Sequence, residues 1–166
     1  GSGKSTLAKA IKSDLLEMGY RVEIVDGDEY RSRICPDLGF SKEHRVESVR
    51  RLSFVAKVLA ENGVVVLMSV INPYEDLRSE ISSSVENSRV VYMKCSVESL
   101  IKRDPKGLYA RALLPEGDPM KIHDFTGISS EYEIPRSPDF IVDTEVETIN
   151  ECKEKLLNFM LKELAK

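Results

Sequence analysis

Cysteine and histidine are scarce in this sequence, and their scarcity excludes several classes of protein. The three cysteines, Cys35, Cys95 and Cys152, are odd in number and far apart, which argues against a disulfide framework or a metal-binding knuckle. Thiols of this kind are typical of a reduced, cytoplasmic protein. The two histidines, His44 and His123, are too few and too distant from each other to indicate a zinc site.

Long hydrophobic runs and an excess of basic residues are also missing. No apolar run approaches the roughly 20 residues that a membrane-spanning helix needs, and the longest one, Val64–Ile71, suits a buried strand. The formal net charge is −4 and no basic stripe is present, so we expect neither a nucleic-acid partner nor a membrane partner. A chain of 166 residues can bury a core, and we expect a single domain.

Short apolar runs alternate along the chain with segments of helical periodicity. The runs are rich in β-branched residues, which is typical of strands buried in a parallel sheet. The alternation predicts an α/β fold in which helices cover both faces of that sheet. We expect strands at Arg21–Val25, Val64–Ile71, Val90–Cys95 and Phe140–Val142, and helices at Ser5–Met18, Arg45–Asn62 and Ile149–Leu164.

One long segment has neither the strand period nor the helix period. Residues Asp104–Pro138 are rich in proline, glycine and charged side chains, and we expect them to lack regular structure. A loop of this length in a compact domain usually has a function, often as a lid over a site.

The most specific motif is the beginning of the chain, Gly1-Ser2-Gly3-Lys4-Ser5-Thr6. It is the second half of the P-loop pattern G-x-x-x-x-G-K-[ST], in which glycines let backbone N–H groups turn toward phosphate oxygens. The helix that follows presents its positive end to the same anion. We expect Lys4 to reach the β- and γ-phosphates of ATP and Ser5 to bind Mg²⁺. The alternative is a glycine-rich turn, which the amphipathic helix directly after the motif disfavours.

The P-loop narrows the fold to a P-loop NTPase-like three-layer sandwich with ATP as the phosphoryl donor. The first glycine of the pattern and the strand that precedes it in such folds are not in the sequence. We therefore expect one more strand at the centre of the sheet, before Gly1.

Acidic residues follow the first predicted strand. Asp26 and Asp28 flank Gly27, and a carboxylate at the carboxyl end of a parallel strand faces the ligand crevice of an α/β protein. We expect Asp26 to hold Mg²⁺ through water or to orient an attacking hydroxyl, because phosphoryl transfer requires mainly positioning and charge stabilisation. A tight turn is the alternative for Asp-Gly-Asp, but the P-loop beside it favours the functional interpretation.

Two arginines are candidates for binding the phosphoryl acceptor. Ser41 is suited to cap a helix, which places Arg45 in the first turn. A positive charge there opposes the helix dipole unless an anion binds at that end. Arg31 and Arg45 could together grip an acidic acceptor through forked hydrogen bonds. Two solvated arginines are the alternative.

Six motifs taken in order resemble the adenylylsulfate kinase family. Each motif is weak alone, but their order and spacing match the family from residue 1 to about residue 144. They are the P-loop, Asp26-Gly27-Asp28-x-x-Arg31, Gly39-Phe40-Ser41-x-x-x-Arg45, Asn72-Pro73-Tyr74, Arg103-Asp104-x-Lys106-Gly107-Leu108-Tyr109 and Phe125-Thr126-Gly127-Ile128.

The resemblance implies a reaction and a role for several residues. ATP would phosphorylate the 3′-hydroxyl of adenosine 5′-phosphosulfate (APS), giving 3′-phosphoadenosine 5′-phosphosulfate (PAPS) and ADP, as in sulfate assimilation. Phe40 and Phe125 would sandwich the acceptor adenine, and Arg31 and Arg45 would bind its phosphosulfate. Asp26 would lie at the metal and the attacking hydroxyl.

The family pattern implies further contacts as well. Arg103 would lie against the ATP adenine, and a lid would span about residues 106–127. The acceptor would also contact Ser48, Ile71, Asn72 and Lys121. The resemblance further implies a cytoplasmic homodimer, in some cases fused to or partnered with ATP sulfurylase.

The sequence departs from the family pattern at four places. Ser48 stands where an asparagine is usual, and His123, with Lys121 nearby, stands where a basic lid residue is usual. Leu113–Pro119 resembles an insertion in the lid. Asn72 replaces a serine that is often described as a phosphoenzyme site, and because an asparagine carries no phosphoryl group we expect direct in-line transfer.

These departures leave two alternatives to an APS kinase. One is a related P-loop kinase that acts on a different nucleotide-like acceptor. The other is a non-enzymatic nucleotide binder, which the presence of Lys4, Ser5 and Asp26 disfavours because mere binding does not require all three.

Overall fold

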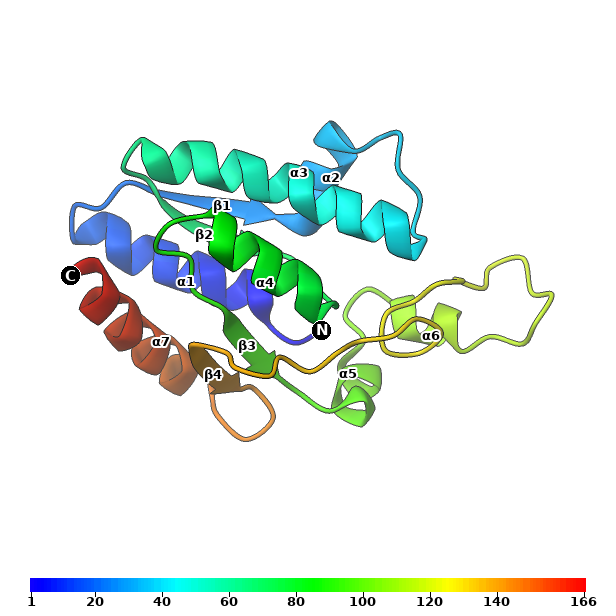
Figure 1. Ribbon diagram of the computed structural model, residues 1–166. Coiled ribbons are helices and arrows are strands. Elements are labelled where there is room, and N and C mark those ends of the chain that lie inside the picture. Colours follow the sequence, from blue (N-terminus) through cyan, green and yellow to red (C-terminus); the bar gives the residue numbers. More distant parts are fainter.

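The structure is a computed structural model that describes all residues, 1–166. All four predicted strands are present, each close to its expected bounds. They are β1 (Val22–Asp26), β2 (Val65–Ser69), β3 (Val91–Lys94) and β4 (Phe140–Asp143). As expected, the strands pair in parallel, β1 with β2 and β3 with β4 (Figure 1).

The three predicted helices are confirmed, and four shorter ones accompany them. The predicted helices are α1 (Lys4–Glu17), α3 (Lys42–Glu61) and α7 (Ile149–Leu164). The additional helices bury too few side chains to produce a periodic pattern, and two of them bury none. They are α2 (Gly27–Ile34), α4 (Glu75–Ser84), α5 (Val97–Arg103) and α6 (Leu108–Ala112). None of the helices combines the length and the apolar composition that crossing a bilayer requires.

Helix α3 begins at Lys42 rather than at Arg45, because Ser41 caps the helix directly before Lys42. The Ser41 hydroxyl accepts a hydrogen bond from the backbone N–H of His44 at 3.3 Å. The helix ends at Glu61, one residue before its expected end, and Gly63 follows its C-cap Asn62 with a φ of +72°, a left-handed conformation that favours glycine.

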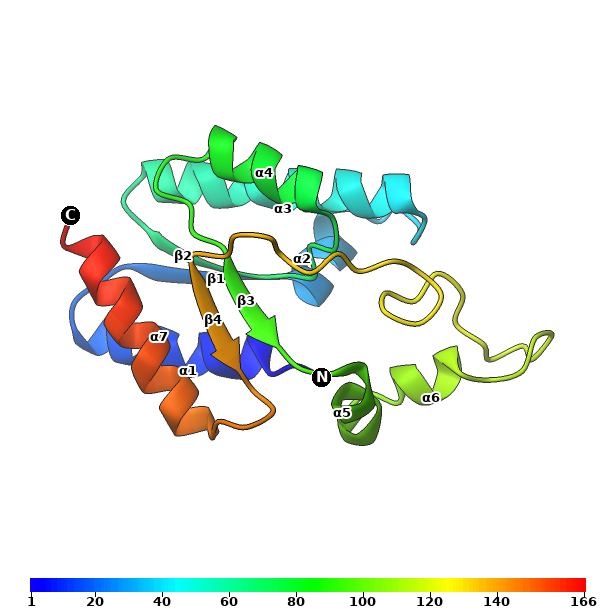
Figure 2. The same cartoon turned by 60° about the horizontal axis from the view of Figure 1, so that its bottom comes forward.

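The helices cover both faces of the strands. Helices α1 and α7 lie on one side, and α3 and α4 lie on the other (Figure 2). The main core lies between α1, α7 and the strands and contains Leu7, Ile11, Leu15, Val22, Val142, Cys152 and Leu156. A smaller core of Val49, Tyr74 and Leu77 joins α3 to α4. Each fully buried aliphatic side chain contributes about 1.5–3 kcal/mol to stability, so these two clusters hold the layers together.

The sheet consists of two parallel pairs rather than one continuous sheet. Strands β2 and β3 form no pair with each other, and Met68 of β2 and Val91 of β3 line a cavity of about 970 Å³. Helix α1 connects the two pairs, because the core it belongs to also packs against Leu67 of β2 and Met93 of β3. The central strand expected before Gly1 stays a prediction.

The segment between α5 and β4 extends away from this core. Figures 1 and 2 show the chain after α6, coloured yellow-green to yellow, projecting beyond the helices and strands. Helix α6 itself lies within the segment that we expected to lack regular structure, so that expectation is wrong for Leu108–Ala112. Gly107 makes this helix possible, since its φ of +64° forms the turn that precedes α6.

Candidate active site

The P-loop ends in a turn that leaves the first N–H groups of α1 open. Gly3 has a φ of +84° and directly precedes the helix. No side chain caps this end of α1, and its first turn contains no acidic residue. Lys4 returns toward the same turn, with its Nζ 3.4 Å from the Ser2 hydroxyl oxygen. Open N–H groups and the positive end of the helix dipole together favour an anion at this position.

Ser5 and Asp26 meet beside the P-loop. The Ser5 hydroxyl donates to the Asp26 Oδ2 at 2.6 Å, and its oxygen lies 3.3 Å from the Ser69 hydroxyl at the end of β2. Asp26 also caps α2, because its Oδ1 accepts hydrogen bonds from the backbone N–H groups of Asp28 and Glu29. Asp-Gly-Asp, for which a tight turn was the alternative, is therefore the start of a helix.

The ionisation of Asp26 follows from these contacts. Burial alone would raise the pKa of Asp26, but hydrogen bonds from Ser5 and from the backbone N–H groups of α2 outweigh it and hold the pKa below its usual value. Asp26 is thus a carboxylate at neutral pH. Hydroxyl and carboxylate oxygens next to a phosphate site are the ligands that Mg²⁺ takes, so Ser5 and Asp26 fit the expected metal.

Burial and nearby carboxylates have opposite effects on the Lys4 ammonium group. Burial lowers the pKa of Lys4, whereas the carboxylates of Asp28 and Asp26 act in the opposite direction. Asp28 also forms an ion pair with Lys106, at the beginning of the expected lid. This pair raises the pKa of Lys106. The lid segment is therefore tied by charge to the carboxylates beside the P-loop.

A second, smaller cavity lies behind the P-loop. It has a volume of about 280 Å³, and Ser2, Gly3 and Thr6 line it together with Arg103 and Thr144. The Arg103 guanidinium donates to the backbone carbonyl of Thr144 and, at 3.3 Å, to its hydroxyl oxygen. The structure thus places Arg103 at one cavity with the phosphate-binding turn.

The acceptor residues Arg31, Phe40 and Arg45 form one group. The guanidinium carbon of Arg31 lies 4.6 Å from the centre of the Phe40 ring, and that of Arg45 lies 5.5 Å from it. Arg31 also donates to the carbonyls of Leu38 and Gly39, and Arg45 donates to the Phe40 carbonyl at 3.0 Å. The two arginines are therefore not simply solvated side chains. Both lie close to the Phe40 ring, which is 59% exposed.

Arg45 brings the second expected aromatic to the same place. Its guanidinium donates to the carbonyl of Asp124, the residue before Phe125, across 79 positions of sequence. The Phe125 ring packs edge-on against Tyr109 of α6, with ring centres 4.9 Å apart. One side chain of α3 thus bonds to the backbone beside both aromatics that are expected to hold the acceptor base.

Comparison with known proteins decides the family. The family model described as Adenylylsulphate kinase matches residues 1–143. The chain belongs to the adenylylsulfate kinase family. The matched region begins with the P-loop and ends with the last residue of β4, so it contains every site residue described above except Thr144.

Members of the adenylylsulfate kinase family match nearly the whole chain. The adenylyl-sulfate kinase of Chloroflexus aurantiacus is 44% identical over 157 residues, which are 95% of this chain and 82% of that protein. The structure of the Mycobacterium tuberculosis APS kinase CysC in complex with AMPPNP and APS has a TM-score of 0.87 at 35% identity, covering 96% of this chain and 91% of that one. The expected P-loop sandwich is thereby confirmed.

A third relative is much longer than this adenylylsulfate kinase. The probable bifunctional SAT/APS kinase 2 of Sorangium cellulosum is 41% identical over 157 residues. They are 95% of this chain but 26% of that protein. The matching region is one part of a longer bifunctional chain there.

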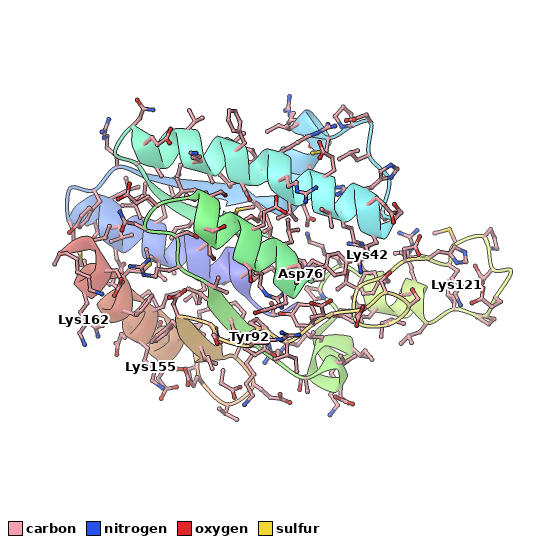
Figure 3. All side chains as sticks on the ribbon, in the orientation of Figure 1. Lys42, Asp76, Tyr92, Lys121, Lys155 and Lys162 are labelled. Atoms are coloured by element: carbon pink, nitrogen blue, oxygen red, sulfur yellow. The ribbon has the colours of Figure 1, made fainter.

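Four remaining residues of the adenylylsulfate kinase pattern occupy different surroundings. Asn72 has a buried Oδ1 without a hydrogen-bond partner, and it lines the large cavity together with Ile71. Ser48 is buried within α3. Lys121 lies in the projecting segment after α6 (Figure 3), where its ammonium group forms an ion pair with Glu116 at 2.6 Å. Lys121 therefore forms no ion pair with the other residues that are expected to bind the acceptor. The roles of all four residues stay predictions.

One buried arginine was not found from the sequence. Arg78 of α4 is 6% exposed and donates to the carbonyls of Asn72 at 2.6 Å and Glu133 at 2.7 Å, and to the carboxylate of Glu75. The Glu133 carboxylate accepts in turn from the Glu75 N–H at 2.6 Å. These contacts of Arg78, here called the Arg78 clamp, hold the segment around Glu133 against the loop that contains Asn72. No motif marks it, because Arg78 and Glu133 lie 55 positions apart in the sequence.

Proposed function

We propose that the protein is an ATP-dependent kinase that phosphorylates the 3′-hydroxyl of APS, giving PAPS and ADP. The observation that carries this proposal is the exposed Phe40 ring with the guanidinium groups of both Arg31 and Arg45 close to it. An aromatic ring suits stacking on a purine, and two guanidinium groups suit a phosphosulfate anion. The family and its named relatives support the same substrate.

The donor side of the reaction is assigned to the P-loop. Its backbone N–H groups and Lys4 would hold the β- and γ-phosphates of ATP, and Arg103 would lie against the adenine. Ser5 and Asp26 would hold Mg²⁺, which when bound neutralises charge on the phosphates. Lys4 contributes charge directed at the group in transfer, and this kind of stabilisation is the largest catalytic term in such enzymes.

The acceptor side is assigned to Asp26. Its carboxylate would accept a hydrogen bond from the 3′-hydroxyl and orient that oxygen toward the γ-phosphorus. The new oxygen–phosphorus bond forms as the bond from the γ-phosphorus to the bridging oxygen of ADP breaks, and the hydroxyl proton passes to Asp26 and then to water. Asn72 supplies no oxygen nucleophile, so transfer is direct. Protein that kept radioactive phosphate after incubation with γ-labelled ATP would contradict this.

The lid is proposed to span about residues 106–127. Two contacts support this assignment: the ion pair of Lys106 with Asp28 at its beginning, and the bond from Arg45 to the Asp124 carbonyl near its end. Both connect the projecting segment to residues of the site. Closure of such a segment would exclude water from the transfer.

The proposed substrate is tested with a panel of acceptors. Purified protein is incubated with Mg-ATP and either APS, adenosine 5′-monophosphate, another nucleotide or no acceptor, and ADP release is measured. We expect turnover with APS well above every other arm. Turnover with a different nucleotide but not with APS would favour the alternative kinase, and nucleotide binding without any turnover would favour a non-enzymatic binder.

We propose in addition a cytoplasmic homodimer. Phe54 is 67% exposed and Val58 43% exposed one helical turn apart on α3, which leaves an apolar strip for a second copy. The free cysteines Cys35, Cys95 and Cys152 suit a reducing compartment. Light scattering of the wild-type protein and of Phe54→Lys tests the dimer, and a wild-type monomer at micromolar concentration would contradict it.

A further inference from the structure

His44 holds the backbone of the loop Leu38–Phe40 through a contact of a different type from those of the two arginines. The N–H of Gly39 donates to the His44 Nδ1 at 3.0 Å. A backbone N–H can only donate, so Nδ1 must be the unprotonated nitrogen of a neutral ring whose proton lies on Nε2. The ring also fills the space beside Gly39, since a Cβ added there would lie 3.1 Å from the same Nδ1.

The carbonyl groups and the N–H group of this loop are bound by different kinds of side chain. Its carbonyl groups are bound by guanidinium groups, those of Leu38 and Gly39 by Arg31 and that of Phe40 by Arg45. The Gly39 N–H is bound by His44. Arginines are protonated throughout the accessible pH range, whereas an imidazole ordinarily gains its second proton between about pH 5 and 8. The contact to His44 is therefore the part of the loop's support that pH can remove.

We propose that His44 is a positioning residue that fixes the Phe40 ring for acceptor binding, and that its protonation in mildly acidic solution weakens binding of the acceptor but not of ATP. The inference rests on the proposed function, in which Phe40 stacks on the acceptor base. Protonated Nδ1 is a donor that faces the Gly39 N–H, a second donor, so the bond is lost and the two groups repel each other. His44 lies in the first turn of α3, close in sequence to Lys42, which Figure 3 labels at the end of that helix nearest the lid.

The charged groups near His44 have both signs. The carboxylates of Asp37 and Glu43 interact electrostatically with the imidazole, and both are engaged elsewhere, Asp37 by Arg51 and Glu43 by the Ser41 hydroxyl. Positive groups oppose them from two elements. They are Arg31 of α2, and Lys42 and Arg45 of α3.

The kinetic test compares the Michaelis constants of both substrates from about pH 8 to pH 5.5. Loss of one hydrogen bond predicts that the KM for APS of the wild type rises about 2- to 12-fold in acid beyond any change in the KM for ATP. His44→Asn places an amide oxygen near the position of Nδ1 and does not titrate, so it should keep the low KM for APS at pH 8 and lose the extra rise in acid. His44→Ala should have the raised KM at every pH, with kcat affected less.

The controls separate this inference from the proposed function. His123→Asn removes the other histidine of the chain and should leave the acid-dependent rise in place. A wild-type protein that does not turn over APS at pH 8 refutes the proposed function instead. In that case the amide NMR signal of Gly39 in the ligand-free protein still tests His44, since it should titrate in the wild type and not in His44→Asn. Identical pH profiles for these two proteins, in KM or in this signal, would overturn the inference.

Discussion

Asp26 is the residue at which stability and catalysis can be separated experimentally. Its carboxylate caps α2 through Oδ1 and accepts the Ser5 hydroxyl through Oδ2 at 2.6 Å. Loss of an N-cap costs about 1 kcal/mol, and loss of the Ser5 hydrogen bond costs about another 1 kcal/mol. Asp26→Ala should therefore lower the free energy of unfolding by about 2 kcal/mol, which corresponds to a fall in Tm of about 4–8 °C.

Asp26→Asn is the matched variant, because the single oxygen of asparagine caps helices about as well as a carboxylate, and its NH2 group can donate to the Ser5 hydroxyl oxygen in place of accepting from it. It should lower the Tm by no more than about 2 °C. The carboxylate that orients the acceptor hydroxyl is lost in both variants, so both should lower kcat about 100- to 10,000-fold. Thermal unfolding by circular dichroism and ADP release under saturating substrates measure the two effects on the same samples.

Two outcomes would refute this reasoning. If Asp26→Asn kept wild-type kcat, the carboxylate would have no part in transfer. If both variants lost activity only in proportion to the unfolded fraction, Asp26 would be structural alone. Acid supplies a further check: because contacts hold the pKa of folded Asp26 below its usual value, its charge stabilises the fold above about pH 4 and ceases to do so as the pH falls through the folded pKa. The Tm advantage of the wild type over Asp26→Asn should shrink there.

The remaining predictions concern three other residues. Lys4→Ala should lower kcat by more than about 100-fold, since it removes charge at the group in transfer, with a Tm close to that of the wild type; near-normal turnover would exclude the assigned role. Phe125→Ala should raise the KM for APS far more than that for ATP, and an effect confined to ATP would place Phe125 in the other pocket. Arg78→Ala should lower the free energy of unfolding by about 3 kcal/mol, because it strands the buried partners of the clamp, whereas Arg50→Ala in the exposed pair with Glu80 should cost less than about 1 kcal/mol. Equal chemical denaturation midpoints for the two arginine variants would contradict the last prediction.

The parts of the fold that sequence predicts are those whose burial repeats with a regular period. Leu7, Ile11 and Leu15 recur at helical spacing and are all buried in α1, so that helix was evident from its pattern. Helix α2 contains no buried residue, and what starts it is the local cap at Asp26. A polar helix of this kind produces no period, and its Asp-Gly-Asp start is compatible with a plain turn.

The candidate site was predictable where a single short segment of the chain contains all the residues that bind one ligand group. The P-loop supplies glycine, lysine and serine within six residues, and the backbone forms the expected turn at Gly3. Contacts between distant segments were not predictable. The bond from Arg45 to the Asp124 carbonyl and the clamp of Arg78 on Glu133 each have a backbone acceptor, and any residue type supplies a carbonyl group. No residue preference in the sequence marks such partners.

The arrangement around Phe40 gives a physical reason for an anionic acceptor. The guanidinium groups of Arg31 and Arg45 both lie close to the Phe40 ring. Burial, together with the positive charge of Arg31, lowers the pKa of Arg45. Backbone carbonyls, including those of Gly39 and Asp124, accept from the two guanidinium groups, but a carbonyl carries no net charge and leaves the repulsion between them largely in place. Hydrogen bonds from a guanidinium to an anion are about twice as strong as those between neutral groups. An anionic acceptor that replaces these carbonyls therefore forms stronger hydrogen bonds with the two guanidinium groups. A neutral nucleoside that replaced them would form no stronger bonds.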